Sequence, residues 1–324
     1  MQLPRFGMGC SALGNLYRPM DDADATATVG QALDRGIAYF DVAPHYGFGL
    51  AEHRLGRALR SFGAEDLTIS TKVGRLLIPT SDTRPRHGFV DAEPFEPVFD
   101  YSHDAILSSH EVSLRRLGLN RVDLLLAHDL GAATHGDEAD RHTASFLNGG
   151  YVAMRRLKSE GRVSAIGIGV NETAICERLL DEVALDVILL AGRYTLLEQG
   201  ALPLLDRCAA LGVQVIVGGP FNSGLLVETS GPRHYNYEAA PPEILERVDR
   251  LARICFAHAV ELPAAALAFP LAHPAVACVL PGFAAPAQVD QFATWRNQAI
   301  PRSLWSGLRA AGLVEPNAPM PGLR

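Results

Sequence analysis

Short apolar runs alternate with longer amphipathic stretches along almost the whole chain. The runs are nearly continuous in hydrophobic residues, which is typical of parallel strands that are covered on both faces. Seven runs predict strands, and the stretch RFGMGCSAL near the N-terminus predicts one more. The expected strands lie at residues 5–13, 37–43, 67–74, 122–129, 163–170, 185–192, 213–219 and 276–282.

The stretches between these runs follow helical spacing and carry helix start and stop signals. The first opens with aspartates and ends at Gly36, and the second begins at Ser102 and stops at Gly118. The expected helices lie at residues 21–36, 102–118, 151–162, 172–183, 202–212 and 243–260. Repeated strand–helix units without a break in composition predict an α/β fold in which eight strands close into a (β/α)8 TIM barrel, rather than an open sheet.

The length of the chain agrees with one large barrel. A chain of 324 residues is long for one domain in general but usual for an α/β barrel, so residues 1–324 are expected to form a single domain. Neither a linker nor a low-complexity segment interrupts the pattern. Residues 74–101, rich in Pro, Asp and Arg, predict a long loop over the mouth of the barrel and a candidate substrate lid.

Composition and charge narrow the classes of partner. The chain is 48% hydrophobic and 20% charged, which predicts a large buried core and excludes general disorder. A net charge of −7 leaves no basic footprint, which argues against nucleic acid or an anionic membrane surface. Neither a membrane-spanning apolar run nor a signal peptide is recognisable. We therefore expect a cytoplasmic protein with a small-molecule substrate, and a homodimer is left open.

Cysteines and histidines give no sign of a metal site. Five cysteines lie far apart without metal-ligand spacing, so we interpret them as mostly buried thiols in a reducing compartment. The histidines between residues 87 and 142 form no compact ligand set. The sequence therefore predicts no metal requirement.

Four ionisable side chains follow the ends of neighbouring expected strands. They are Asp41, Tyr46, Lys72 and His128. In a barrel of parallel strands, the active site is built where the strands end and the loops begin. A tyrosine whose ordinary pKa is about 10 is a poor base at neutral pH, but an adjacent ammonium held by a carboxylate would favour its phenolate. A histidine on the other side can donate a hydrogen bond to a substrate oxygen.

Each of these residues also has a structural interpretation when taken alone. A tyrosine there is usually a packing residue, a lysine is usually solvated or paired, and a histidine is often a satisfied core residue. Together, in this order and spacing, the four resemble the catalytic tetrad of the aldo-keto reductases. Within that family the runs VAPHYGFGLAEHRLGRAL, TKVGRLL and IGIGVNE resemble the D-threo-aldose (L-fucose), L-galactose and pyridoxal 4-dehydrogenases.

The resemblance implies roles for the tetrad and its neighbours. Tyr46 would exchange a proton with the substrate oxygen, and Lys72 would lower the pKa of Tyr46. Asp41 would pair with Lys72, and His128 would orient and polarise the substrate. Two further residues, His45 and Arg193, are expected on the substrate side.

The resemblance also implies a nicotinamide cofactor. Asn171 matches the residue that holds the carboxamide, and Tyr194 matches the aromatic that stacks on the nicotinamide, whereas Ala191 stands where the family often has a glutamine. The stretch GGPFNSGLL corresponds to the loop against the pyrophosphate, although a merely connecting turn explains its glycines equally well. The remaining expected cofactor contacts are Cys10, Ser11, Gly219, Pro220, Phe221, Asn222, Gly224, Leu225, Pro281, Gly282, Phe283, Gln288 and Gln291.

The region after the last strand predicts which cofactor is preferred. Members that prefer NADP tend to place Lys or Arg at the positions that fall here on Gly282 and Gln288, where the cations meet the 2′-phosphate. Both residues are uncharged, and Phe292 replaces the usual asparagine for the adenine. The resemblance therefore implies NAD rather than NADP.

Three functional hypotheses follow. The first is oxidation of the C1 hydroxyl of an aldose such as L-fucose to the lactone, with hydride transfer to the nicotinamide; the direction in the cell is left open. The second is a pyridoxal 4-dehydrogenase or another aldehyde or alcohol oxidoreductase. A hydrophobic pocket would favour this second hypothesis, and several hydroxyl-binding groups would favour sugars. The third, outside enzymes, is a nucleotide-binding regulatory subunit.

Overall fold

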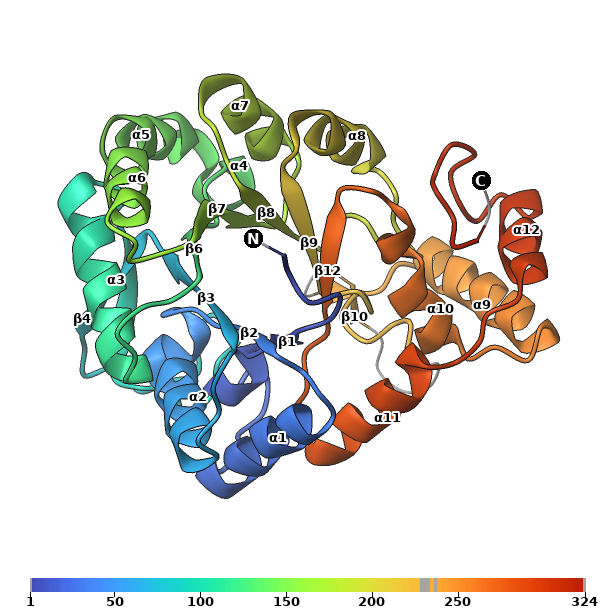
Figure 1. Ribbon diagram of the computed structural model, residues 1–324, viewed down its shortest axis with the longest axis horizontal. Helices are drawn as coiled ribbons and strands as arrows, with labels where there is room; N and C mark the ends of the chain where they lie inside the picture. The colour runs from blue at the N-terminus through green and yellow to red at the C-terminus, as the bar shows by residue number, and fades with distance from the viewer. Residues whose placement is uncertain (1, 228–233, 236–237, 323–324) are drawn as a thin grey trace.

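The computed structural model describes residues 2–227, 234–235 and 238–322. Its main sheet has eight strands in the order β1-β2-β3-β6-β7-β8-β9-β12, and every neighbouring pair is parallel. Parallel bridges join Phe6 to Val279 and Gly9 to Gly282, so the first and last strands also meet. Helices surround this closed sheet (Figure 1). The expected (β/α)8 barrel is confirmed.

All eight barrel strands lie within the ranges that the apolar runs predicted. Their bounds are β1 Met8–Gly9, β2 Tyr39–Asp41, β3 Thr68–Val73, β6 Leu124–His128, β7 Ala165–Val170, β8 Val187–Ala191, β9 Gln214–Gly218 and β12 Val276–Leu280. Nearly every strand residue is buried, because helices cover the outer face of the sheet and side chains fill the inside.

The helices that cover the barrel begin and end close to the predicted signals. The side chain of Asp21 accepts a hydrogen bond from the Asp24 amide at the start of α1, and Gly118 ends α3 at φ 66°. The predicted helices are α1 Asp22–Asp34, α3 His103–Leu117, α6 Tyr151–Ser159, α7 Ala174–Glu182, α8 Leu202–Leu211 and α9 Pro242–Ala257. The others are α2 Leu50–Ser61, α4 Ala132–His135, α5 Ala139–Ser145, α10 Leu262–Ala268, α11 Pro286–Arg296 and α12 Arg302–Ala310.

The inside of the barrel changes from apolar to polar along the strands. Alternate strand residues share one face of a sheet, and the inward-facing set forms its own apolar cluster. That cluster consists of Leu3, Tyr39, Leu124, Leu126, Ala165, Val187, Leu189, Ile216, Cys278 and Leu280. Two residues beyond Tyr39 and Leu126 on the same face lie Asp41 and His128. The packed interior therefore supports a polar layer at the carboxyl ends of the strands.

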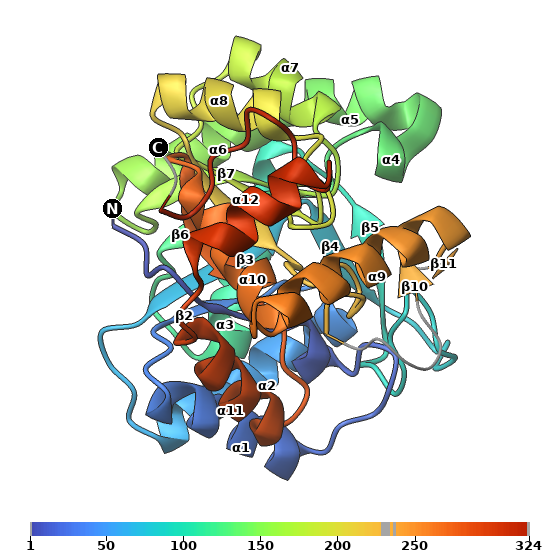
Figure 2. The ribbon, with the colours of Figure 1, turned by 90° about the vertical axis from the view of Figure 1, so that its right-hand side faces the viewer.

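The segment at residues 74–101 is more ordered than the predicted loop. β4 (Arg75–Pro79) pairs antiparallel with β5 (Phe95–Phe99), so the expectation of a loop throughout was wrong. Both strands are short and contain a proline, which weakens the strand pattern in the sequence. The ribbon lies, with β10 (His234–Tyr235) and β11 (Glu238–Ala239), on the side of the barrel opposite the N-terminus (Figure 2).

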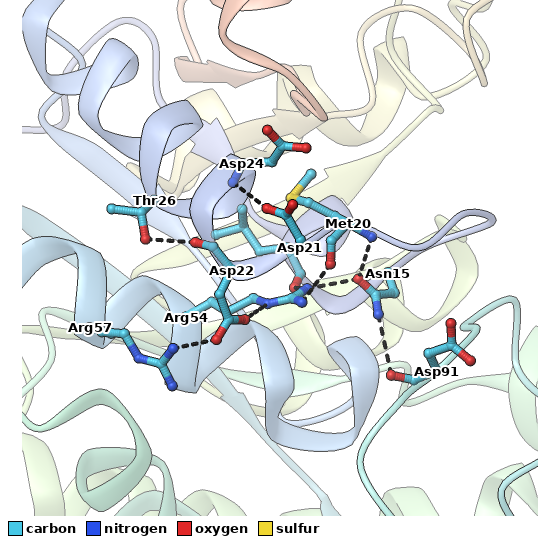
Figure 3. A network of polar contacts seen from close by, with 10 residues as sticks. Asn15, Met20, Asp21, Asp22, Asp24, Thr26, Arg54, Arg57 and Asp91 are labelled. Atoms are coloured by element: carbon cyan, nitrogen blue, oxygen red, sulfur yellow. Dashed lines mark hydrogen bonds and ion pairs between the residues drawn. The ribbon is translucent and has the colours of Figure 1, made fainter.

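Arg54 of α2 holds the segment that connects β1 to α1 (Figure 3). Its guanidinium donates hydrogen bonds to the Leu13 carbonyl at 2.8 Å, to Asn15 Oδ1 at 2.7 Å and to the Met20 carbonyl at 2.6 Å. Asn15 has a left-handed backbone, φ 65°, and its Nδ2 donates to the Asp91 carbonyl at 3.2 Å. One buried guanidinium thus fixes this segment, and Asn15 links the segment to residues 74–101.

Replacing this guanidinium is expected to destabilise the fold measurably. Arg54→Met removes the donor to these three acceptors and to Asp22 Oδ1, which Arg54 Nε contacts at 2.8 Å, and this should lower the free energy of unfolding by about 1–3 kcal/mol. Arg57→Met is the matched control, because Arg57 pairs with the same Asp22 from an exposed position; its effect should stay within about 1 kcal/mol. Urea unfolding of the two variants measures the difference. Equal losses would contradict the role given to Arg54.

Three further features concern only the residues that the structure describes. The five cysteines are buried free thiols, as the sequence predicted. Groups of three or more His, Cys, Asp or Glu side chains that could hold a metal ion are absent from the described ranges. Over the same ranges, no single helix is long and apolar enough to cross a membrane; α9 with Leu262–Ala272 meets the length and composition test only as a pair bent by 99°.

Candidate active site

The structure brings the four predicted catalytic residues together at the mouth of the barrel. Asp41 and His128 end β2 and β6, and Lys72 lies on β3 between these strands. Tyr46 follows β2 in a tight turn against Gly14, where a Cβ atom would lie 2.5 Å from the Tyr46 carbonyl carbon. Only glycine allows this close approach. The turn therefore depends on residues from two loops.

Lys72 is the centre of a buried polar network. Its Nζ lies 2.7 Å from Asp41 Oδ2, 3.1 Å from Tyr46 Oη and 3.1 Å from the Val42 carbonyl, which gives each of its three N–H groups an acceptor. The side chain is only 2% exposed. Gly169 of β7 faces the Lys72 side chain, and a Cβ atom there would lie 3.3 Å from Lys72 Cε.

A second layer of hydroxyls supports Asp41, and sequence reasoning did not identify it. Ser70 Oγ donates to Asp41 Oδ1 at 2.6 Å, and Ser70 Oγ lies 2.9 Å from Tyr39 Oη. Ser70 and Lys72 are two residues apart on β3 and so share its inward face. That two-residue spacing could have identified Ser70 as a neighbour of the catalytic residues.

Burial and charge act in opposite directions on the pKa values of this network. Burial lowers the pKa of Lys72, but the charges of Asp41 and Tyr46 outweigh it and raise that pKa above its ordinary value. Burial raises the pKa of Tyr46 to about 12, although the Lys72 ammonium lowers it. Lys72 thus lowers the pKa of Tyr46 as the resemblance implied, but desolvation of the phenolate exceeds the attraction of the ammonium, so the pKa is raised overall. Tyr46 is therefore protonated at neutral pH.

The rings of His128 and His45 line the same cavity as Tyr46. The His128 ring lies 6.0 Å from the Tyr46 ring and 6.0 Å from the His45 ring, measured between centroids. Burial and the nearby cations Arg75 and Lys72 lower the pKa of His128 well below its ordinary value. The same causes lower the pKa of His45 to about 2. Both imidazoles are therefore neutral at working pH, and a neutral imidazole can still donate one hydrogen bond.

These pKa directions predict different pH profiles for the two reaction directions. If Tyr46 exchanges the proton, as the resemblance implies, reduction needs its protonated form, which is fully present below the raised pKa, so kcat/KM for an aldehyde should stay flat from about pH 6 to about pH 9. Oxidation would then need the phenolate, so kcat/KM should rise with pH by up to about tenfold per unit over this range. Steady-state rates in both directions measure the profiles. If kcat/KM for reduction falls tenfold as the pH is raised from about 6 to about 9, the pKa of Tyr46 is far lower than about 12.

A cavity of about 860 Å³ opens beside these residues. The predicted site residues on its wall are Ser11, Asp41, His45, Tyr46, His128, Asn171, Gly219 and Gly282. Residues that sequence reasoning did not assign to the site complete much of the wall: Tyr17, Arg75, His87, Phe89, Phe99, Asp129 and Thr134. A larger hollow of about 1120 Å³ lies against α10, α11 and the C-terminal residues, far from this polar layer. The polar layer, rather than volume, identifies the candidate active site.

One side of this cavity fits a nicotinamide cofactor. Gly9, Gly218, Gly219 and Gly282 line it where β1, β9 and β12 end. Gly219 has φ 58°, and a Cβ atom there would meet nothing within 4 Å, so its backbone faces open space. Glycines let backbone N–H groups approach an anion closely. The exposed amide of Asn171, which follows β7, offers the donor and acceptor that a carboxamide needs.

Other predicted cofactor and substrate residues lie away from the cavity. Tyr194 is fully buried, with its ring 5.4 Å from Phe269 and 5.6 Å from His273. The expectation that it faces the nicotinamide is not met, because the chain turns at Gly192, φ 70°, and carries the ring into the core. Cys10 is fully buried beneath the mouth. Arg193 pairs with Glu198 at 3.0 Å, outside the cavity wall.

Several residues of the two predicted cofactor loops have structural contacts instead. The Asn222 side chain accepts a hydrogen bond from Thr195 Oγ1 at 2.6 Å and donates to Glu198 Oε1 at 2.9 Å. The Phe221 ring lies 6.0 Å from Trp295, and the Phe283 ring lies 5.3 Å from Phe292. The other predicted contacts that are not part of the cavity wall are Pro220, Gly224, Leu225, Pro281, Gln288 and Gln291.

Comparison with known proteins agrees with this geometry. A sequence model described as the aldo/keto reductase family matches residues 5–310. The chain is 41% identical to pyridoxal 4-dehydrogenase from Microbacterium luteolum, covering 95% of this chain and 94% of that protein. It is 38% identical to D-threo-aldose 1-dehydrogenase from a Pseudomonas species, covering 97% and 95%. A glycerol dehydrogenase structure from Gluconobacter oxydans superposes with a TM-score of 0.73 at 21% identity, covering 99% and 95%.

Proposed function

The chain belongs to the aldo/keto reductase family of oxidoreductases, and we propose that it oxidises the C1 hydroxyl of an aldose such as L-fucose to the lactone with NAD. The observation that carries this proposal is the Lys72 ammonium, which is held by Asp41 and lies 3.1 Å from the Tyr46 hydroxyl. Tyr46 lines the same cavity as His128. The identity with D-threo-aldose 1-dehydrogenase supports an aldose as substrate.

The residues divide the proton chemistry between them. In the oxidation, Tyr46 as phenolate takes the proton of the C1 hydroxyl, and Lys72 stabilises that phenolate until the proton arrives. Asp41 keeps Lys72 charged and in place. Neutral His128 donates a hydrogen bond to the C1 oxygen and orients it. A nicotinamide held beside Gly219, Gly282 and Asn171 would supply the hydride acceptor for C1, which would become the carbonyl carbon of the lactone.

Two features of the described residues support NAD over NADP. Arg75 is the only Lys or Arg on the described part of the cavity wall, and it lies at the His128 side rather than at Gly282. Gln288 Oε1 accepts a hydrogen bond from the Ala284 amide at 2.6 Å, which holds this side chain at the start of α11. Among the residues that the structure describes, a 2′-phosphate would therefore lack the cations that usually bind it.

Aromatic residues of the cavity favour a second candidate, oxidation of pyridoxal. Phe89, Phe99 and Tyr17 line the wall beside the polar residues and add aromatic surface to it, which suits a planar ring. The identity with pyridoxal 4-dehydrogenase supports the same candidate. A nucleotide-binding regulatory subunit is less well supported, because it would not need the Asp41–Lys72–Tyr46 arrangement.

One activity panel separates these candidates. Purified protein is assayed for formation of reduced cofactor, with NAD or NADP, against L-fucose, D-arabinose, L-galactose and pyridoxal. We expect turnover of a sugar with NAD and a lower kcat/KM with NADP. Turnover of pyridoxal alone would keep the proposed chemistry and replace the substrate. Cofactor binding without turnover of any of the four would refute the proposed function.

The proposal extends to the domain organisation, location and assembly of the protein. We propose a single domain over residues 1–324, a cytoplasmic location, and a small-molecule substrate rather than nucleic acid or membrane as partner. A homodimer is the assembly to be tested first. Light scattering after size-exclusion chromatography gives the assembly state, and limited proteolysis tests whether the chain behaves as one domain.

A further inference from the structure

Two charged residues stand directly beyond the catalytic strand ends and face each other in the cavity. Arg75 is the first residue of β4, three positions after Lys72, and Asp129 follows His128. Gly74 at φ 100° and Asp129 at φ 50° turn the two chain segments at these points. The Arg75 guanidinium forms an ion pair with Asp129 Oδ2, and both residues line the cavity wall.

This ion pair is held firmly. The Arg75 guanidinium lies over the Phe99 ring, with Cζ 4.6 Å from its centroid, which restricts it from one side. The side chains of Arg75 and Asp129 are 9% and 17% exposed. Burial raises the pKa of Asp129, and the charge of Arg75 opposes that rise. A fixed and partly desolvated donor–acceptor pair can discriminate between ligands that complete its hydrogen bonds and ligands that do not.

The pair retains hydrogen-bonding capacity toward the cavity. Among the described residues, none donates to Asp129 Oδ1 and none accepts from Arg75 Nη1. Both residues keep some exposure, and both lie on the cavity wall. A substrate hydroxyl has one hydrogen to donate and lone pairs that accept. One such hydroxyl could donate to the carboxylate and accept from the guanidinium at the same time.

The position of the pair relative to His128 specifies which substrate hydroxyl this is. Asp129 Oδ2 lies 3.5 Å from His128 Nε2. His128 is the proposed donor to the oxygen of the reacting carbon. The ion pair is therefore next to the place where the neighbouring oxygen of the substrate would lie. Two oxygens on neighbouring carbons lie about a hydrogen-bond length apart, which matches this spacing. An oxygen on a more distant carbon would fall farther from the pair.

We propose that Arg75 and Asp129 bind the hydroxyl on the carbon next to the one that is oxidised. The substrate class is then a compound with oxygens on two neighbouring carbons, such as an aldose that keeps its 2-hydroxyl. This inference rests on the proposed function and restricts its substrates. A 2-deoxy sugar would leave the buried charges without their partner and would be rejected.

The test compares a sugar with its 2-deoxy analogue in matched variants. Wild-type protein should favour L-fucose over 2-deoxy-L-fucose by about 100-fold or more in kcat/KM. The double variant Arg75→Met/Asp129→Leu replaces the pair by apolar side chains, which a buried ion pair often tolerates without loss of fold. Its preference should fall to about threefold or less, mainly because activity on L-fucose drops. Asp82→Leu/Arg84→Met removes an exposed Asp–Arg pair from the same segment and should keep the wild-type preference.

The possible outcomes separate failure of this inference from failure of the proposed function. If kcat/KM falls by the same factor on both sugars in the Arg75/Asp129 variant, the preference is unchanged and the role of the pair is overturned. The proposed sugar oxidation by the wild-type protein would still stand. Unfolding midpoints and the milder variant Asp129→Asn, which should lower the preference in the same direction, exclude loss of fold as the cause. If pyridoxal alone is oxidised, the substrate carries no hydroxyl on the neighbouring carbon, and this inference is overturned while the oxidoreductase activity remains. If wild-type protein oxidises neither class, the proposed function is wrong and this inference falls with it.

Discussion

Tyr46→Phe is expected to lower kcat/KM by about 10³–10⁴-fold while leaving the fold and cofactor affinity unchanged. The Tyr46 hydroxyl lies 3.1 Å from the Lys72 ammonium, and the ring lines the cavity. Phenylalanine keeps the ring and its packing but removes the only atom that exchanges the proton. Steady-state kinetics with NAD and the best sugar measure the loss, and cofactor titration followed by intrinsic fluorescence checks that binding persists.

The matched control is Tyr39, a fully buried tyrosine inside the barrel. Tyr39→Phe removes a hydroxyl that contacts Ser70 Oγ at 2.9 Å but does not line the cavity. It should cost about 1 kcal/mol of stability and less than about tenfold in kcat/KM. Comparable losses in the two variants would mean that Tyr46 contributes through the buried network rather than through proton transfer.

Lys72→Met is expected to damage both activity and stability. It removes the ammonium that stabilises the Tyr46 phenolate, which should lower kcat/KM for oxidation by about 100-fold or more. It also leaves the Asp41 carboxylate buried, 5% exposed, without its partner at 2.7 Å. Breaking a buried pair from one side costs about 3–5 kcal/mol, so the free energy of unfolding in urea should fall by that amount.

A double variant separates these two effects. Asp41→Asn/Lys72→Met removes the charge as well as its partner, while the asparagine oxygen still accepts the hydrogen bond from Ser70. We expect it to be more stable than Lys72→Met alone and equally inactive. If the double variant were less stable than Lys72→Met, the uncompensated charge of Asp41 would not be the cause of the destabilisation.

The barrel was predictable because its physical requirements are visible in the sequence. Strands that are buried on both faces must be apolar throughout, and all eight barrel strands lie within runs of that kind. The ribbon of β4 and β5 was missed because it has one exposed face, is short and contains Pro79 and Pro97. Its pairing depends on contacts between segments that the local sequence does not show.

The residues at the centre of the candidate site could be predicted from the sequence, as the barrel strands could. The residues around that centre could not. Asp41 and His128 follow from the two-residue period of strands that end at the mouth. Tyr194 lies beyond a left-handed turn at Gly192, so its direction depends on packing against Phe269. Arg75 and Asp129 lie just past Lys72 and His128, and that adjacency was the available signal for the ion pair.

The balance of forces on Tyr46 could not be obtained from residue types. The sequence indicates that Lys72 is near, and the ammonium does lower the pKa of Tyr46. Burial of the phenolate acts in the opposite direction and is larger, and burial is known only once the fold is known. With a pKa of about 12, Tyr46 is protonated at neutral pH and is ready to act as an acid in reduction. It can act as a base in oxidation only after it has lost that proton.

The central claim is that this chain moves hydride from C1 of an aldose to a nicotinamide while Tyr46 takes the hydroxyl proton. The most direct measurement uses L-fucose carrying deuterium at C1, with NAD, and locates the deuterium by NMR. We predict one deuterium on C4 of the reduced nicotinamide for each lactone formed, and a slower rate than with unlabelled sugar if hydride transfer limits turnover. Deuterium in the solvent water, or a lactone formed without labelled cofactor, would contradict direct transfer.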